Sequence, residues 1–214
     1  MLSTLGYVAA RHPFGFAVLY GGLKTLVADV MVQTVVERRK LGEIDQKRAA
    51  VFLGFGFLQV GAVQYGVYVR MFTRLFPNSA KFSAAPLSAK LRDTAGKLTV
   101  AKQVCLDMFV YHPFCYFPVF YICKEVVNCQ EVNLDIIPRA LNNYWPHSYE
   151  DCKALWTIFI PVSIIQFSVM PVHLRVPFNA TVGFLWCAIL SNMRGQSQDT
   201  VKALQKFTSL RSHH

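Results

Sequence analysis

Four charged side chains lie within or between long runs of apolar residues: Lys24, Asp29, Asp107 and Arg175. A charge at the centre of a bilayer costs roughly 2.5–3.5 kcal/mol, so each of these groups needs a partner or a function. Pairing of opposite charges is the cheapest compensation, and we therefore expect Arg175 to bond to Asp29 or Asp107. The alternative is that these groups line a water-filled path and select solutes by charge.

Arg175 separates two uncharged runs, Ala154–Leu174 and Val176–Met193, if His173 is taken as neutral. Proline residues stand close to it on both sides, at positions 171 and 177. Because proline interrupts the hydrogen bonding of a helix, this spacing predicts a bend or a tight turn around Arg175. The sequence leaves open whether the region is one broken helix or two short spans.

The distribution of apolar residues predicts the elements that position these charges. Hydrophobic residues make up 53% of the 214-residue chain and charged residues 16%, against about 25% charged residues in an ordinary soluble domain. The apolar residues gather in five blocks: Pro13–Val36, Ala49–Val69, Val104–Cys123, Ala154–Leu174 and Val176–Met193. A membrane helix needs roughly 20 such residues. We therefore predict an all-α, polytopic membrane protein with four or five transmembrane helices in a compact bundle.

These blocks belong to a single transmembrane domain, which we place at residues 1–195. The remaining residues, 196–214, form a short tail in which Val201, Leu204 and Phe207 lie opposite lysine residues on a helix. An apolar stripe facing a basic one is typical of a helix that lies in the membrane interface.

Small and polar residues recur at every fourth position of the first block, and they are Ala17, Gly21, Thr25, Asp29 and Gln33. Residues four apart share one face of a helix. Small residues on such a face let a second helix approach closely, and polar ones bond across the contact. We favour this packing seam over the alternative, the wall of a water-filled path.

The second block repeats the pattern in the pairs Ala50/Gly54, Gly54/Gly61 and Ala62/Gly66. Glycine in a helix costs about 1 kcal/mol relative to alanine, so these residues predict tight helix packing. Gln59 and Gln64 in the same block should face a neighbouring helix or a lumen.

The net charge of +10 does not indicate a nucleic-acid-binding protein. The cations lie between the apolar blocks, as in Arg38-Arg39-Lys40 and Lys47-Arg48, instead of forming a basic face with aromatic readers. This placement favours contact with anionic lipid head groups.

Motifs of enzymes and cofactor sites are missing from the sequence, which has no GxGxxG, P-loop, HExxH or GxSxG pattern. Asp107 and His112 are five residues apart, which does not suit an acid–base pair, and His112 and His173 have no set of further metal ligands. We therefore expect no enzyme, no cofactor and no metal site.

Taken together, the residues resemble the twenty-two-kilodalton peroxisomal membrane protein family of the Mpv-seventeen type, in its mitochondrial inner-membrane branch. The resemblance spans roughly residues 5 to 195. Its signature residues here are Pro13, Gly22, Trp156, Phe167, Pro171, His173, Trp186 and Ser191. The resemblance implies a four-helix protein of the mitochondrial inner membrane or, as the alternative, of the peroxisomal membrane. Some members are weakly selective pores for small solutes, and mitochondrial members are associated with metabolite balance.

Two functions follow as expectations from the resemblance and the buried charges. The first is a small-solute pore lined by Asp29, Gln33, Gln59, Asp107 and Arg175. The second is a non-catalytic accessory subunit that associates with copies of itself or with a larger inner-membrane complex. Departures from the family pattern at Ala28, Met108, Phe159 and Gln166 favour the accessory subunit, because they fall where the family usually carries other inward-facing residues.

Overall fold

The computed structural model describes residues 7, 9–129, 131–133 and 135–184, and every regular element among them is a helix. The predicted all-α class is therefore confirmed. The first long helix, α2 (Pro13–Met31), begins with Pro13, which suits a first turn because its missing N–H would have no partner there. The helix continues into a π-helical segment, η1 (Val32–Val36).

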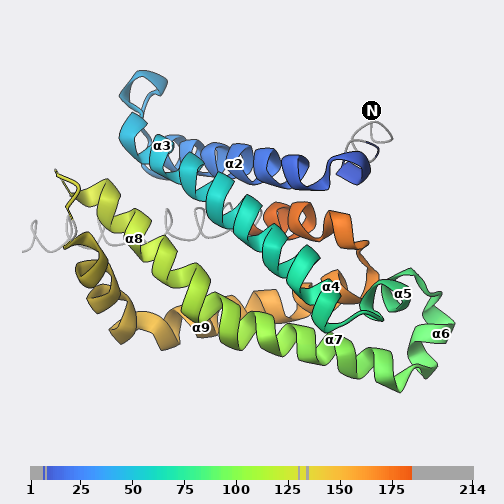
Figure 1. Ribbon diagram of the computed structural model, residues 1–214. Helices are drawn as coiled ribbons and strands as arrows, with labels where there is room; N and C mark the ends of the chain where they lie inside the picture. The colour runs from blue at the N-terminus through green and yellow to red at the C-terminus, as the bar shows by residue number, and fades with distance from the viewer. Residues whose placement is uncertain (1–6, 8, 130, 134, 185–214) are drawn as a thin grey trace, which may run out of the picture.

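A short hairpin then returns the chain along α2 (Figure 1). It contains a single 3₁₀ turn, η2 (Leu41–Glu43), and ends at Asp45, whose carboxylate accepts a hydrogen bond from the backbone N–H of Arg48 and so caps the next helix. This second long helix, Gln46–Leu75, has four named segments: α3 (Gln46–Phe55), η3 (Gly56–Val63), η4 (Gly66–Met71) and α4 (Phe72–Leu75).

Two short helices, α5 (Ser79–Ala84) and α6 (Leu87–Arg92), connect to the third long helix. That helix has three consecutive segments: α7 (Thr94–Leu106), η5 (Asp107–Tyr116) and α8 (Phe117–Asn128). A fourth, α9 (Ile136–Val169), packs against both α7 and α8. The chain then turns through η6 (Val172–Leu174) into a helix that begins at Arg175 and is described as far as Phe184.

The start of α9 differs from the prediction. The predicted apolar block begins at Ala154, but the helix already begins at Ile136 and contains Pro146 and Pro161. Around Arg175 the chain forms two separate helices, since α9 ends at Val169 and Pro171 precedes the helix that begins at Arg175. The predicted tail, residues 196–214, lies outside the described residues.

Within the described residues, three helices are long and apolar enough to cross a membrane: Pro13–Val36, Gln46–Leu75 and Ile136–Val169. The predicted block Val104–Cys123 is helical but is not among them. Polar residues within the block, such as Asp107 and His112, reduce its apolar character.

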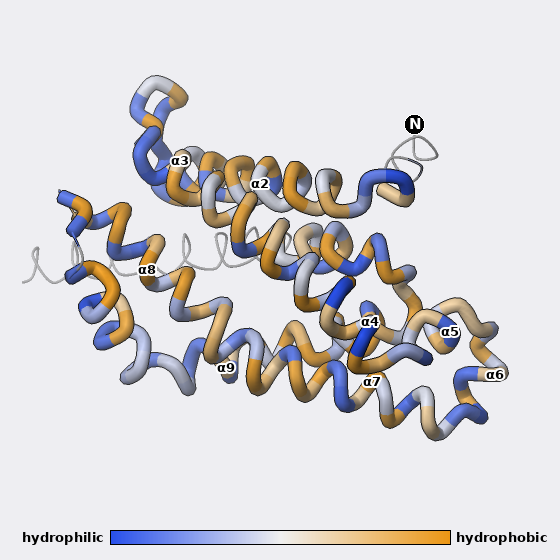
Figure 2. The backbone as a smooth tube through the Cα atoms, in the orientation of Figure 1, coloured by the Kyte–Doolittle hydropathy of each residue, from blue (hydrophilic) through white to orange (hydrophobic). Residues whose placement is uncertain are grey.

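Hydropathy along the backbone follows this arrangement (Figure 2). Hydrophilic residues gather in the α2–α3 hairpin, around α6 and in the first half of α9, whereas the other long helices carry mostly apolar residues. On α2 the side chains of Leu19, Leu23 and Val27 are more than half exposed and recur every fourth residue. They form an apolar face opposite the glycine-containing face, as expected of a helix that contacts lipid.

Candidate functional site

The contact between α2 and the second long helix depends on glycine. A β-carbon placed on Gly21 would lie 2.8 Å from the carbonyl oxygen of Gly56 and 2.9 Å from the backbone nitrogen of Gly61. Thr25 lies on the same face and donates to the carbonyl oxygens of Gly21 and Gly22. The packing seam predicted on α2 is therefore confirmed.

On the second helix the prediction was only partly right. Gly61 lies in the seam, where a β-carbon would meet the backbone of Val18, but Gly54 and Gly66 have no other residue within reach of a β-carbon. Gly56, which the pairing pattern did not include, supplies the second point of close approach. The four-residue spacing misplaced the contact because this stretch is π-helical and has more residues per turn.

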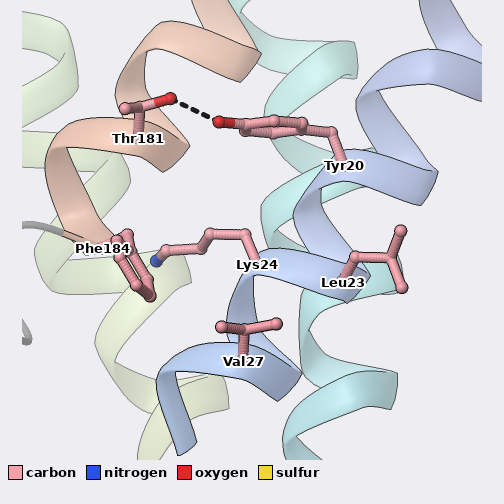
Figure 3. A pocket seen from close by; sticks show the side chains of 6 residues that line it. All are labelled: Tyr20, Leu23, Lys24, Val27, Thr181 and Phe184. Atoms are coloured by element: carbon pink, nitrogen blue, oxygen red, sulfur yellow. Dashed lines mark hydrogen bonds between the residues drawn. The ribbon is translucent and has the colours of Figure 1, made fainter. Parts of the chain in front are cut away.

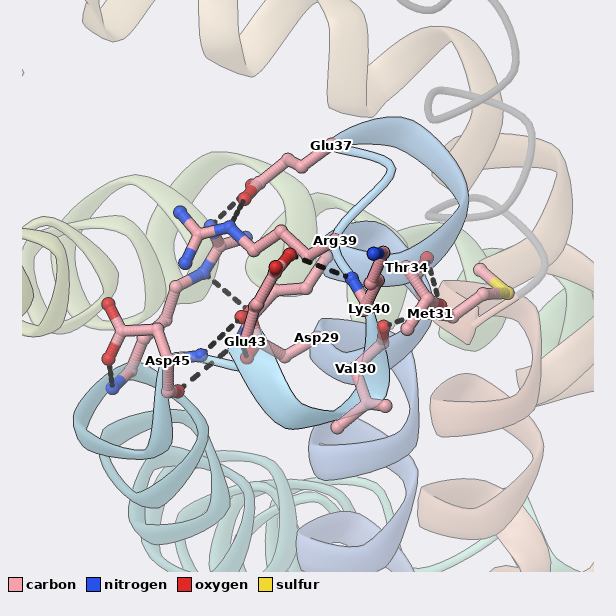
Figure 4. Close-up of polar contacts among 11 residues, drawn as sticks. Asp29, Val30, Met31, Thr34, Glu37, Arg39, Lys40, Glu43 and Asp45 are labelled. Carbon is pink, nitrogen blue, oxygen red and sulfur yellow. Dashed lines mark hydrogen bonds and ion pairs between the residues drawn. The ribbon is translucent and has the colours of Figure 1, made fainter.

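Asp29 and Gln33 belong to a hairpin network, which we define as Asp29, Gln33, Glu37, Asp45 and Arg48. Figure 4 labels Asp29, Glu37 and Asp45 of this network, together with Arg39. Asp29 is 6% exposed, and its carboxylate accepts hydrogen bonds from Nε of Arg48 at 2.6 Å and from Nε2 of Gln33 at 2.8 Å. The Oε1 atom of Gln33 accepts from the backbone N–H of Asp45 at 2.7 Å. These bonds tie the end of α2 to the start of α3.

The hairpin network extends to the protein surface through Glu37. Its carboxylate bonds to Nη1 of Arg48 at 2.5 Å and to Nε of Arg39 at 2.9 Å. Arg48 thus compensates the buried charge of Asp29. The expectation that Arg175 bonds to Asp29 is wrong. The partner of Asp29 is Arg48, in the first turn of α3.

A second set of polar side chains, the core network, lies between the second, third and fourth long helices; its members are Gln59, Tyr68, Asp107, Tyr111, His112 and Ser163. Asp107 is 1% exposed, and its carboxylate accepts from the Tyr68 hydroxyl at 2.8 Å and from the Ser163 hydroxyl at 3.3 Å. One carboxylate thereby bonds to side chains from both neighbouring helices.

His112 also contacts Asp107, contrary to the expectation drawn from their spacing. Its Nδ1 atom lies 2.9 Å from the backbone oxygen of Asp107 and 3.2 Å from Oδ1. Both residues are in η5, a π-helix, in which the backbone bonds run from residue i to residue i+5. Residues five apart therefore share a face here, which they do not in an α-helix.

Gln59 joins the core network from η3. Its Nε2 atom lies 3.3 Å from the Tyr111 hydroxyl and 3.4 Å from the backbone oxygen of Cys115. The Tyr111 ring in turn packs edge-on against Tyr68, with 5.9 Å between the ring centroids. The structure therefore brings Gln59 and Asp107 together and separates them from Asp29 and Gln33. Tyr68 and Ser163 were not predicted, because an aromatic residue or a serine in an apolar run carries no signal of its own.

Three of the signature residues that the structure describes pack against other side chains, and they are Gly22, Trp156 and Phe167. Gly22 lies against the Phe57 ring, and Trp156 donates from Nε1 to the backbone oxygen of Met108 at 2.9 Å. Met108 and Phe159, two of the departures from the family pattern, are buried in the main apolar core. Pro171 follows the end of α9 and His173 lies in η6. Trp186 and Ser191 lie outside the described residues.

Arg175 is fully buried, with 0% of its surface exposed. Its guanidinium stacks on the ring of Phe167 at 5.3 Å from the centroid, and none of its three nitrogens has a hydrogen-bond partner within the described part of the chain. Phe167 packs against Tyr68, which holds Asp107. Aromatic rings thus stand between the cation and that carboxylate, and the predicted bond to Asp107 is wrong as well.

Lys24 lies in a shallow crevice between α2 and the helix that begins at Arg175 (Figure 3). Leu23, Val27 and Phe184 supply apolar walls, and one end is closed by the hydroxyls of Tyr20 and Thr181, 2.6 Å apart. The hydroxyl contact fixes the last described helix against α2.

The fold and these networks define a helical membrane protein with a polar core. Comparison with known proteins agrees with this description. The model of the Mpv17 / PMP22 family matches residues 134–191. The chain is 24% identical to the mitochondrial inner membrane protein Mpv17 of Danio rerio, over 85% of this chain and 90% of the relative, and equally identical, with the same coverage, to that of Homo sapiens. It is 20% identical to Protein SYM1 of Debaryomyces hansenii, over 89% of this chain and 86% of that protein.

The chain is therefore similar to the Mpv17 / PMP22 family. The predicted resemblance to this family and the predicted location in the mitochondrial inner membrane are confirmed by these relatives. No solved structure matches the chain.

Proposed function

We propose that this protein forms a weakly selective pore for small solutes in the mitochondrial inner membrane and thereby takes part in metabolite homeostasis of the organelle. The core network is the observation that supports the proposal. Its side chains come from three long helices and are buried together, although polar and ionisable groups are costly inside a membrane. Such groups usually face the interior of a bundle or a water-filled cavity, and they mark solute pathways.

The structure divides the predicted lining residues into two sets with different roles. Asp29 and Gln33 are bonded within the hairpin network, so we assign them to holding α2 and α3 together. Gln59, Asp107 and Arg175 lie deeper in the bundle and remain candidates for the lining. We further propose that the basic connections contact anionic lipid head groups and that the function involves no catalytic step.

Two matched variants test the pore. Asp107→Asn and Asp29→Asn each remove one buried carboxylate, but only the first belongs to the core network. In planar bilayers containing the purified protein, we expect Asp107→Asn to shift the selectivity between cations and anions toward anions, whereas Asp29→Asn should leave the selectivity unchanged. The proposal fails if the purified protein does not conduct, or if both variants change the ion preference equally.

A second candidate function, an accessory subunit of a larger inner-membrane complex, is favoured by the way in which the core network is bonded. The side chains of the core network bond to one another, as they would in a purely structural core. The native mass of the protein in mild detergent separates the two functions. A native mass of one or a few copies would support the pore. Stoichiometric migration of the protein with a much larger assembly would support the accessory subunit.

A further inference from the structure

Four buried polar side chains lack a hydrogen-bond partner for one or more of their atoms at one end of the bundle. They are Ser79, Gln103, Gln166 and Arg175, and each is at most 1% exposed. In a folded protein nearly all buried polar side chains are bonded, so a group of unbonded ones needs an explanation.

Gln103 and Gln166 can be placed relative to the Asp107–Ser163 bond. The third long helix and α9 run antiparallel, since Met108 bonds to Trp156 and, further along, Pro113 bonds to Tyr144. Gln103 precedes Asp107 by four residues, and Gln166 follows Ser163 by three. Both amides are therefore displaced by about one turn toward the same end, on the faces where the two helices meet.

Arg175 lies at this same level. Its guanidinium stacks on Phe167, the residue next to Gln166, and the turn at Pro171 brings it back alongside the end of α9. Ser79 lies on α5, which packs against both α7 and α9. We call Gln103, Gln166 and Arg175, with Ser79 at its edge, the arginine layer.

The charge in this layer is not compensated by the rest of the core. Arginine keeps its proton under all ordinary conditions, so Arg175 cannot become neutral to avoid the cost of burial. The nearest carboxylate of the core network, Asp107, is already bonded by Tyr68, Ser163 and His112. A buried guanidinium with unused donors, at the same level of the bundle as two amides whose nitrogens and oxygens all lack partners among the described residues, presents a site for a negatively charged oxygen group.

We propose that the arginine layer binds a small oxyanion, a carboxylate or phosphate group, which the guanidinium of Arg175 and the amide nitrogens of Gln103 and Gln166 hold by hydrogen bonds. The proposed binding site depends only on these residues and not on the proposed pore. Only its consequence for transport, a preference for anionic solutes, rests on the proposed pore. The oxygen group could belong to a free solute or to the head group of an anionic lipid.

The test uses the purified full-length protein in bilayer discs of zwitterionic lipid. Its melting temperature is measured with inorganic phosphate and with succinate, against chloride at equal ionic strength, and again with anionic lipid in the disc. A ligand that binds only the folded state raises the melting temperature. We expect phosphate or succinate to raise it by several degrees if the source is a solute, and anionic lipid alone to do so if the source is a head group.

Three variants show whether the effect comes from this layer. With Arg175→Gln, the ligand concentration needed for the same rise in melting temperature should be at least ten times higher. Gln166→Glu places a carboxylate beside Arg175, so it should raise the melting temperature without ligand and abolish the response; a variant expected to be more stable cannot lose the response by misfolding. Arg48→Gln, which removes an arginine from the hairpin network, should keep the full response.

The proposal is overturned if none of the three ligands raises the melting temperature, or if Arg175→Gln responds like the unmodified protein. Measurements of conductance remain separate. If the protein responds to oxyanions but does not conduct, the proposed site is supported and the proposed pore is wrong. If the protein conducts but does not respond to oxyanions, the proposed pore is supported and the proposed site is wrong.

Discussion

Removing Arg48 tests the role of the hairpin network. Arg48→Gln would leave the charge of Asp29 buried, with its side chain 4% exposed, and bonded only by Gln33. Loss of one partner from a buried ion pair costs about 3–5 kcal/mol. Because 22% of the Arg48 side chain is exposed and Gln33 still donates, we expect a loss at or just below the lower limit of this range, about 2–3 kcal/mol.

Thermal unfolding in mild detergent measures this change. For a chain of this length each kcal/mol lowers the melting temperature by about 2–4 °C, so Arg48→Gln should lower it by about 5–10 °C. The matched control is Arg39→Gln, since Arg39 bonds to the same Glu37 but at the surface, with its side chain 39% exposed. Exposed pairs contribute up to about 1 kcal/mol, so the control should change little.

The double variant completes the reasoning. In Asp29→Asn/Arg48→Gln no buried charge is left without its partner, and the loss of stability should be clearly smaller than the sum of the two single losses. If Arg48→Gln is no less stable than Arg39→Gln, or if the two single losses simply add, then Arg48 does not compensate Asp29 and the hairpin network is not a structural unit.

Two further substitutions test other contacts. Gly21→Ala should destabilise the protein by about 1–3 kcal/mol, because the added β-carbon would meet the backbone of the second helix. Gly54→Ala, whose β-carbon would meet no other residue, should be neutral or stabilising in the same melting experiment. Equal effects of the two substitutions would contradict the packing seam. Tyr68→Phe removes one donor to the Asp107 carboxylate and should cost about 1.5–3 kcal/mol, while Tyr149→Phe, on the exposed surface, should cost almost nothing.

The helices and the α2 seam could be predicted because they depend on local properties. Long apolar runs indicate membrane helices, and small residues at every fourth position of α2 indicate a face that packs closely. The same reasoning misplaced the contact on the second helix and excluded the pair Asp107–His112. Both errors have one cause. The α-helical period was applied to segments that are π-helical, and the sequence does not predict π-helices.

The partners of the buried charges could not be predicted because they depend on how distant segments meet. Asp29 has Arg48 within reach only because the hairpin is short and Asp45 caps α3 at the right level. Arg175 is kept from both carboxylates by the break at Pro171 and by the rings of Phe167 and Tyr68. Opposite charge alone did not determine which groups pair.

The central claim, that the core network lines a path for water-soluble molecules, is tested most directly by the reactivity of single cysteines. In a variant without the six native cysteines, Ser163→Cys would place a thiol beside Asp107, and Ile164→Cys would place one on the adjacent residue, 47% exposed on the apolar surface of α9. A charged, membrane-impermeant thiol reagent applied to the protein in lipid should modify the cysteine at position 163 and leave that at 164 unmodified. If the cysteine at 163 reacts only after denaturation, the core network is a closed structural core and the pore proposal is wrong.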